Sequence, residues 1–448
     1  MSEEAFVSVP NPLKTQREVP KASREDLPLL AILPFLDLSP EGEEGHLCEG
    51  LAEEILQALN KVEGLRVLSR TSSFLYKDAH LPLEEIGKRL GVQWLLAGSL
   101  RKEQAHLVLN AELIEVDSGR QLWSNRFERE GADIFTLVGE IVSGVASVLH
   151  LPSPGHRRAS ADLEAYDYYL KGRQYYFRFN RHGMRFASQM FQEAIDLDPS
   201  YAAAWAGLAL CAAYLFIYVD RCEQHRQQAE SASLKALDLD PNLAEAHVSR
   251  GVALSAAGNF EEAEEAYEAA LRLDPNLYEA YYLYARHCFA VGRPEEAIQY
   301  FEWAAAVRPD DFQAVLLVAQ AYVSLGVFDE AEAARRRGLA LVEERLKHAP
   351  DDVRARYLGA NALVALGERE KGLAWARMAR DLDPEDSMLL YNLGCIHALA
   401  GEAEEALDCL ILAVRAGLSQ KDWILHDGDL VSLRQHPRFQ EVLRLLNQ

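Results

Sequence analysis

A 34-residue periodicity in the second half of the chain constrains its fold more than any other feature of the sequence. The prolines that separate successive units stand 34 residues apart in three intervals: Pro241 to Pro275, Pro275 to Pro309, and Pro350 to Pro384. Within one unit, small and aromatic residues recur at helical spacing, as in Ala263, Tyr267 and Ala270. Such a period predicts pairs of antiparallel helices, each of which buries its apolar face only by stacking on the next pair.

Glycines mark the expected turns between the two helices of each unit, because glycine adopts a left-handed backbone at the least cost. They are Gly258, Gly292, Gly326, Gly367 and Gly401. The period, the glycines and the prolines together resemble the tetratricopeptide repeat. The resemblance implies an α-solenoid of seven repeats over residues 161–417. The tail, residues 418–448, ends in an amphipathic segment that we expect to form a C-terminal capping helix.

Two repeats are longer than the unit. The interval from Pro199 to Pro241 is 42 residues, and its extra length falls around Tyr218–Gln228. The interval from Pro309 to Pro350 is 41 residues, seven more than the unit, which is about two helical turns. We therefore expect the second helix of the fifth repeat to project beyond the stack, through Glu343–Lys347.

The N-terminal part of the chain has a different residue pattern and lacks the 34-residue period. Residues 1–26 are polar and lack periodicity, which predicts a flexible arm, and residues 151–160 read as a linker. Between them, 27–150 predicts the order strand, helix, strand, helix, followed by three strands and a closing helix. The expected strands lie at 27–39, 65–70 and in the runs VQWLLAGSLRK, AHLVLNAELIEV and QLWSNRFER. The last three should form a meander, in which Asp117–Ser118–Gly119 signals the hairpin turn between the last two. The fold class is thus α/β plus all-α: a mixed-sheet α/β sandwich domain followed by the solenoid.

The motifs AILPFLDLS, GLAEEILQAL, GLRVLSRTSSF, IGKRLGVQWLLAGSLRK and GRQLWSNRFER, in this order, resemble the TolB amino-terminal-like domain. Followed by repeats, this tandem is similar to the non-catalytic C-terminal half of class III adenylyl cyclase-like and transmembrane transcriptional regulator-like bacterial proteins. Those relatives carry a catalytic or DNA-binding domain in front of the module, whereas about 26 residues precede it here. The resemblance implies a regulatory or adaptor half that acts alone.

Composition restricts the classes of partner and compartment. The formal net charge of −23 disfavours binding to nucleic acid phosphates and to anionic membranes. The six cysteines form no CxxC pair, and the N-terminus lacks the pattern of a signal peptide. We therefore expect a cytoplasmic protein with reduced, mostly buried thiols, and a protein or peptide as its partner. The sequence leaves the oligomeric state open.

The sequence contains no recognisable catalytic constellation. GxxxxGK[ST], GxGxxG, GxSxG and HExxH are all absent. Cys48 beside His46 lacks a third orienting group, so we interpret it as a buried thiol rather than a nucleophile. His426, Asp427 and Asp429 resemble a fragment of a metal site, but we interpret them as a polar turn before the last helix. We expect no enzyme activity, no cofactor and no metal.

One weaker candidate site lies after the second strand of the N-terminal domain. A hydroxyl-rich turn there could offer backbone N–H groups and a guanidinium to an anion such as a phosphate. Its residues are Ser69, Arg70, Thr71 and Ser72. The alternative is that these hydroxyls satisfy the backbone at the end of a strand.

The solenoid gives a sharper hypothesis. In a tetratricopeptide repeat the first helix lines the concave face, and placing the repeats in register gives a predicted groove: Tyr282, Arg286, Phe289, Gln313, Leu317, Gln320, Tyr357, Asn361, Tyr391 and Asn392. Asn361 and Asn392 resemble the asparagines with which peptide-binding relatives hold a peptide backbone. The lysines of the carboxylate-clamp version are absent. The alternative is that these asparagines are simply solvated.

The first repeat, AYDYYLKGRQYYFRF, is unusually aromatic. Tyr166, Tyr169, Tyr176 and Phe177 share one helix face, which indicates a seam with the N-terminal domain or an exposed partner site. These features favour a non-enzymatic scaffold or adaptor that binds a protein or peptide in the concave groove. The alternative function is a regulatory or sensory subunit whose N-terminal domain binds a small ligand.

Overall fold

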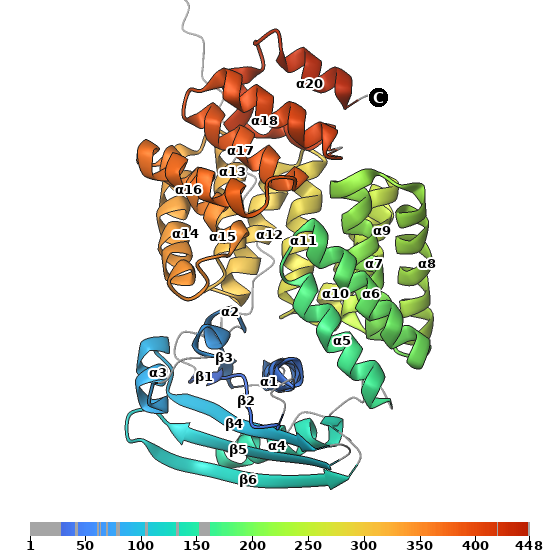
Figure 1. Ribbon diagram of the computed structural model, residues 1–448, viewed down its shortest axis with the longest axis vertical. Coiled ribbons are helices and arrows are strands. Elements are labelled where there is room, and N and C mark those ends of the chain that lie inside the picture. Colours follow the sequence, from blue (N-terminus) through green and yellow to red (C-terminus); the bar gives the residue numbers. More distant parts are fainter. Residues whose placement is uncertain are drawn as a thin grey trace, which may run out of the picture.

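The computed structural model describes residues 28–40, 44–60, 62, 64–68, 70–77, 81–103, 106–130, 134–151, 162–418 and 420–446. An α/β domain lies at one end, and a curved stack of helices rises from it (Figure 1). The predicted fold class, a mixed-sheet α/β region followed by an α-solenoid, is confirmed. The predicted arm at 1–26 and nearly all of the predicted linker fall outside the described residues.

The sheet is mixed, in the order β3-β1-β4-β5-β6. Its strands are β1 (Leu29–Ile32), β2 (Leu36–Asp37), β3 (Arg66–Val67), β4 (Trp94–Glu103), β5 (His106–Glu115) and β6 (Arg120–Glu130). β1 pairs in parallel with β3 and β4, whereas β4, β5 and β6 form the predicted antiparallel meander. The residues from 27 to 39 were expected as one strand, but Pro34 follows the end of β1 and lacks the N–H that a ladder needs. The chain resumes as β2, which pairs farther along β4.

Helices cover both faces of this sheet. They are α1 (Gly45–Asn60), α2 (Arg70–Ser73), η3 (Phe74–Tyr76), α3 (Leu83–Leu90) and α4 (Ile134–Val148). Apolar side chains of α1 and α4 pack on one face, and those of α3 and η3 pack on the other. The second strand, expected to reach residue 70, ends at Val67, and the hydroxyl-rich segment after it forms the short helix α2 instead of an open turn.

The solenoid of residues 162–418 consists of seven helix pairs. They are α5 (Leu163–Tyr176) with α6 (Arg181–Leu197), α7 (Ala202–Leu215) with α8 (Glu223–Leu239), α9 (Ala244–Ala257) with α10 (Phe260–Leu273), α11 (Tyr278–Ala290) with α12 (Pro294–Val307), α13 (Phe312–Ser324) with α14 (Phe328–His348), α15 (Val353–Ala365) with α16 (Arg369–Leu382), and α17 (Ser387–Leu399) with α18 (Ala403–Arg415). The glycines in the turns between the two helices of the later pairs have positive φ, as at Gly326 (φ 74°), where a side chain would strain the backbone.

Both stretched repeats show where their extra residues go. α7 continues into the π-helical turn η4 (Phe216–Asp220), and Arg221 then takes a left-handed φ of 47°. The run Ala202–Asp220 is the one described helix long and apolar enough to cross a membrane, but 72% of its 18-residue apolar window is buried inside the protein, as in the core helix of a solenoid. α14 has 21 residues and reaches the N-terminal domain, where the His348 ring lies 5.2 Å from that of Tyr76.

The aromatic first repeat lies at the seam between the two parts of the protein. Tyr166 and Tyr169 belong to one apolar cluster with the core of the N-terminal domain. Leu170 packs directly on Gly50 of α1, where a Cβ atom would lie 2.2 Å from the leucine side chain. Arg173 donates a hydrogen bond to Glu53 at 2.6 Å across the same seam. Because the two parts share a core, they form one packed unit.

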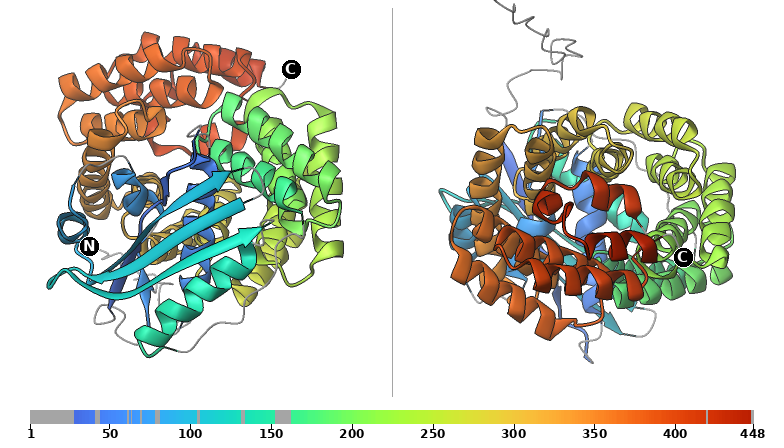
Figure 2. Two further views of the ribbon diagram at one scale, coloured as in Figure 1. Left: turned by 60° about the horizontal axis from the view of Figure 1, so that its bottom comes forward. Right: turned by 90° about the horizontal axis from the view of Figure 1, so that it is seen from above.

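The solenoid curves so far that its last repeat meets its second. Figure 2 shows the C-terminal helices lying beside the N-terminal pairs when the molecule is seen from above. Ser387 at the start of α17 donates a hydrogen bond to the Tyr218 carbonyl in η4. The backbone N–H of Arg181 donates to Asp386 at 3.3 Å. The concave face is therefore enclosed on several sides by the chain itself.

Candidate functional site

The chain itself covers the predicted groove. After α18 the chain turns back through α19 (Lys421–His426) and η5 (Gly428–Leu433) before α20 (Phe439–Leu445) packs on α18. We refer to Lys421–Leu433 as the C-terminal segment. It packs against α11, α13 and α17, whose side chains line the concave face. Thus α20 covers the last helix pair as the predicted cap should, but the residues before it lie inside the curve of the solenoid.

The predicted groove residues come together on this face and are shielded from solvent. Gln313 is half-buried, and the other nine are buried. They are Tyr282, Arg286, Phe289, Leu317, Gln320, Tyr357, Asn361, Tyr391 and Asn392. The alternative, that the asparagines are simply solvated, is wrong, because Asn361 and Asn392 are only 6% and 5% exposed. A partner could reach Arg286, Phe289 and Asn361, which contact the C-terminal segment, only after that segment moves.

Trp423 is the apolar anchor of the C-terminal segment. Its ring meets that of Phe289 edge-on, with centroids 4.9 Å apart. The Arg286 guanidinium lies 5.5 Å from the Trp423 ring and also donates a hydrogen bond to the Tyr218 hydroxyl. Aromatic and cation–π contacts of this kind stabilise a buried aromatic side chain beyond its area alone. The indole Nε1 of Trp423 has no hydrogen-bond partner among the described residues.

Asp427 and Asp429 form the polar contacts between the C-terminal segment and the concave face. The Asn361 amide donates a hydrogen bond of 2.7 Å to Asp429, and Arg335 lies 3.4 Å from that carboxylate. The Tyr391 hydroxyl donates to Asp427. His426, Asp427 and Asp429 were expected as an ordinary polar turn, but both carboxylates are buried, Asp427 completely. Partners from three helix pairs therefore hold them.

Burial changes the acidity of both groups. It raises the pKa of Asp427 to about 7, and the nearby charge of Asp429 adds to this effect. Burial also raises the pKa of Asp429, although Arg335, Asn361 and Gln320 oppose the shift. The Cys395 thiol, 3.7 Å from Asp427, has a pKa raised well above its usual value by burial. Both carboxyl groups are thus weaker acids than exposed aspartates, because burial disfavours their charged forms.

Other predicted groove residues bond within the repeats rather than to the C-terminal segment. The Asn392 amide donates to the Met388 carbonyl of its own helix at 2.7 Å. Arg354 donates to the hydroxyls of Tyr282 at 2.6 Å and Tyr357 at 3.3 Å. Gln313 lies beside Asp311. Of these contacts, the one between Arg354 and Tyr282 joins two repeats, the sixth and the fourth. The prediction that these residues bind a peptide remains a prediction.

Sequence reasoning missed three important residues. Arg335 comes from a second helix, which the repeat pattern assigns to the convex face, and it reaches Asp429 from α14. Tyr218 lies in the insertion, outside the repeat register, and Arg354 was omitted from the groove. A usable signal was the run WILHDGD, which places a large apolar residue and two acids in a tail that is too long for a simple cap.

The predicted anion site is only partly within the described residues. Ser69 lies outside them, as do the side chains of Arg70 and Thr71. Ser72 is half-buried in α2, a helix of four residues, which is too short to supply an N-terminal anion site of its own. The anion site therefore stays a prediction. Cys48 is buried, and burial raises its pKa to about 12, as expected for a structural thiol.

Comparison with known proteins identifies the repeats. Residues 224–278, 248–301 and 282–344 match the tetratricopeptide repeat family. The chain is 31% identical over 266 residues to "Putative adenylate cyclase 3" of Rhizobium meliloti (strain 1021). That match covers 56% of this chain and 45% of the relative, so the chain spans less than half of the relative's length. The chain thus contains tetratricopeptide repeats, as predicted, whereas the TolB-like character of the N-terminal domain remains an expectation.

Solved structures with similar folds are more distant. A monomeric mutant of IFIT1 with Gppp-AAAA is 14% identical, with a TM-score of 0.44, over 65% of this chain and 66% of that one. A thermophilic tetratricopeptide repeat protein from Thermus thermophilus is 20% identical, with a TM-score of 0.36, over 44% of this chain and 98% of its own.

Proposed function

We propose that this protein is a non-enzymatic interaction scaffold whose concave face binds a peptide segment with an aromatic residue followed by two acidic residues. Its own C-terminal segment occupies the face until a partner displaces it. The tetratricopeptide fold supports a protein-interaction scaffold in general. The observation that carries the finer proposal is that Phe289, Arg286 and Asn361, all predicted groove residues, hold Trp423 and Asp429 of the segment.

Two features make the C-terminal segment an exchangeable occupant. The unpartnered indole Nε1 of Trp423 and the buried acid of Asp427 each cost stability, so the fit is not optimal. The segment is also tethered, and a tether gives it an effective concentration of about 1 mM or more. A partner can therefore succeed by making additional contacts elsewhere, although it competes poorly through this face alone.

The test uses a released variant and a peptide added in trans. Trp423→Ala removes the apolar anchor, and a fluorescent peptide with the sequence of residues 420–434 serves as the probe. Fluorescence anisotropy should show binding to the Trp423→Ala chain and little binding to the wild type. Adding Asn361→Ala to the released variant should weaken binding at least about tenfold, the loss expected for a buried hydrogen bond to a charged group. Val431→Ala is the matched control, because Val431 lies in the same segment but is exposed.

The peptide result decides the proposal. If the released variant binds neither the peptide nor any protein from the native lysate, the concave face is a closed structural core, and the groove assignment is wrong. If the peptide binds but Asn361→Ala has no effect, the peptide-binding role of Asn361 is wrong. Far-ultraviolet circular dichroism confirms in each case that the helices remain folded.

The second candidate function is a regulatory subunit whose N-terminal domain binds a small ligand. The similarity to a protein named as an adenylate cyclase favours a signalling context. The shared core at Gly50 and Leu170 gives a ligand on the N-terminal domain a route to the repeats. ATP and cyclic AMP are the first probes, read by the thermal transition of the full chain. A higher transition temperature with either probe supports this function. An unchanged transition temperature with each of the two probes argues against it.

The assignment as a non-enzymatic, intracellular protein belongs to the same proposal. Five of the six cysteines are buried and none is paired, which suits a reducing compartment. The expected result is no turnover of ATP by the purified chain. Turnover that survives purification and disappears on a single substitution would contradict it.

A further inference from the structure

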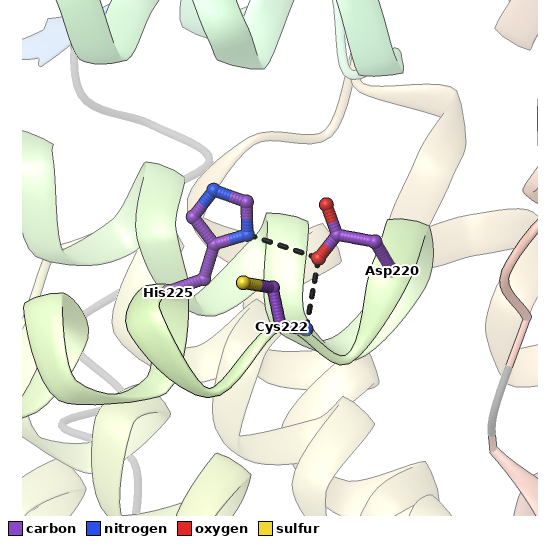
Figure 3. A group of neighbouring side chains, drawn as sticks. All are labelled: Asp220, Cys222 and His225. Atoms are coloured by element: carbon purple, nitrogen blue, oxygen red, sulfur yellow. Dashed lines mark hydrogen bonds and ion pairs between the residues drawn. The ribbon is translucent and has the colours of Figure 1, made fainter.

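The insertion in the second repeat brings Asp220, Cys222 and His225 together, as Figure 3 shows. We propose that these three side chains bind a divalent transition-metal ion of the zinc class. Their ligand atoms all lie within 4.8 Å of one another. Asp220 Oδ1 accepts hydrogen bonds from His225 Nδ1 and from the backbone N–H of Cys222, both at 3.0 Å.

The geometry needs only small side-chain movements to hold an ion. Zinc binds sulfur at about 2.3 Å and nitrogen or oxygen at about 2.0–2.2 Å, so its ligands stand roughly 3–4 Å apart in a tetrahedral site. In the bound form the ion would replace the hydrogen bond between His225 and Asp220. Three protein ligands leave a fourth position for water or for a group from a partner.

The ligand set determines the class of ion. A thiolate and an imidazole select zinc-like ions over magnesium or calcium, which prefer sites made entirely of oxygen. The carboxylate and the thiolate together neutralise a divalent charge. This matters because the cluster lies at the N-terminus of α8, where the helix dipole disfavours net positive charge.

Three independent features set this turn apart from the other repeats. It holds the extra residues of a 42-residue interval in which the ordinary unit has 34. It contains the π turn η4 and the left-handed Arg221, and both kinds of irregularity are concentrated at functional sites. Cys222 is also the exposed cysteine, whereas the other five are buried.

The position of the turn gives the ion a consequence for the whole solenoid. η4 is the element that meets the last repeat, through the Tyr218 carbonyl and Ser387. Tyr218 also receives the hydrogen bond of Arg286 on the concave face. An ion bound at the adjoining residues would fix the turn, and with it the contact that encloses the concave face.

The test is a cobalt titration of the full chain after treatment with a chelator and a reductant. Co²⁺ bound to a thiolate gives a charge-transfer band in the near ultraviolet, so the expected result is this band at one equivalent. Zn²⁺ should displace the Co²⁺ and should protect Cys222 from a maleimide. The thermal transition should rise in the presence of Zn²⁺.

Substitutions assign the band to the proposed ligands. Cys222→Ser should abolish it, and His225→Ala should weaken binding at least about tenfold, with loss of the maleimide protection. Asp238→Asn is the matched control, since this exposed carboxylate lies on the same helix and pairs with Lys235. No thiolate band in the wild type, or an unchanged band in Cys222→Ser, would overturn the proposal.

Discussion

The side-chain amide of Asn361 donates a hydrogen bond of 2.7 Å to the carboxylate of Asp429, which joins the sixth helix pair to a segment 68 residues later in the chain. Asn361 was predicted to hold a peptide backbone in trans, but in this structure it holds a side chain of the same molecule. Because the bond is buried, breaking it leaves an acceptor without its full complement of donors. This contact makes the concave face and the C-terminal segment one unit.

Asn361→Ala should lower the free energy of unfolding by about 1–3 kcal/mol, because it removes a buried hydrogen bond from Asp429. Hydrogen exchange should also rise at the backbone amides of Gly428–Leu433. Asn392→Ala is the comparison, since its amide bonds to its own helix and should leave exchange in this segment unchanged. Equal exchange in the two variants would show that Asn361 does not hold the C-terminal segment.

Trp423→Ala should release the C-terminal segment while the rest of the solenoid stays folded. The residue is 6% exposed and packs on Phe289, and truncating such a side chain typically costs about 3–5 kcal/mol. Limited proteolysis should then cut within 419–436 faster than in the wild type. Cleavage first in the N-terminal domain would instead indicate that Trp423 stabilises the whole chain.

Asp427→Asn should stabilise the protein at pH 8, and the gain should shrink as the pH falls to 5. The folded pKa of Asp427 is about 7, above the usual value for an aspartate, so the folded state binds the proton more tightly than the unfolded state. The contribution of the Asp427 carboxyl to the stability of the fold is complete below the pKa of the unfolded state and is lost as the pH rises through the folded pKa of about 7. Urea midpoints of both proteins across this range check the sign, and a constant difference would contradict it.

Gly417→Ala should be more damaging than an ordinary glycine substitution. Gly417 has a φ of 112°, and a Cβ atom there would lie 1.4 Å from the Val219 carbonyl of η4. Overpacking and backbone strain together should lower the free energy of unfolding by about 3 kcal/mol or more. Gly326→Ala is the control, because its φ is also positive but nothing lies within 4 Å. Similar losses in both variants would mean that the contact between the repeats contributes little.

The sequence predicted most of the secondary structure, because each element carries its own periodic signal. The hairpin at Gly119, the meander β4-β5-β6 and the 21-residue helix α14 all follow from local patterns. Two predictions of secondary structure were wrong: the length of the first strand and the conformation of the segment after the second strand. Pro34 interrupted the first strand, and the segment from Arg70 to Ser73 became a helix rather than a turn.

The candidate site could be predicted only in part. The 34-residue register predicted Phe289 and Asn361 on one face, because residues at equivalent positions of stacked repeats point the same way, and both contact the C-terminal segment. It did not predict that Asp427 and Asp429 would lie against that face. Asn361 and Asp429 stand 68 positions apart, and no local pattern records that they meet.

The sequence by itself therefore determined the repeating unit and the order of elements, since both depend on periodicity and on turn residues. Only the tertiary structure decided what covers that face and how the chain closes upon itself. The curvature of a solenoid is the sum of small rotations between neighbouring repeats, and this sum brings Tyr218 to Ser387 and Trp423 to Phe289. Such a sum depends on every interface between repeats and is visible in none of them alone.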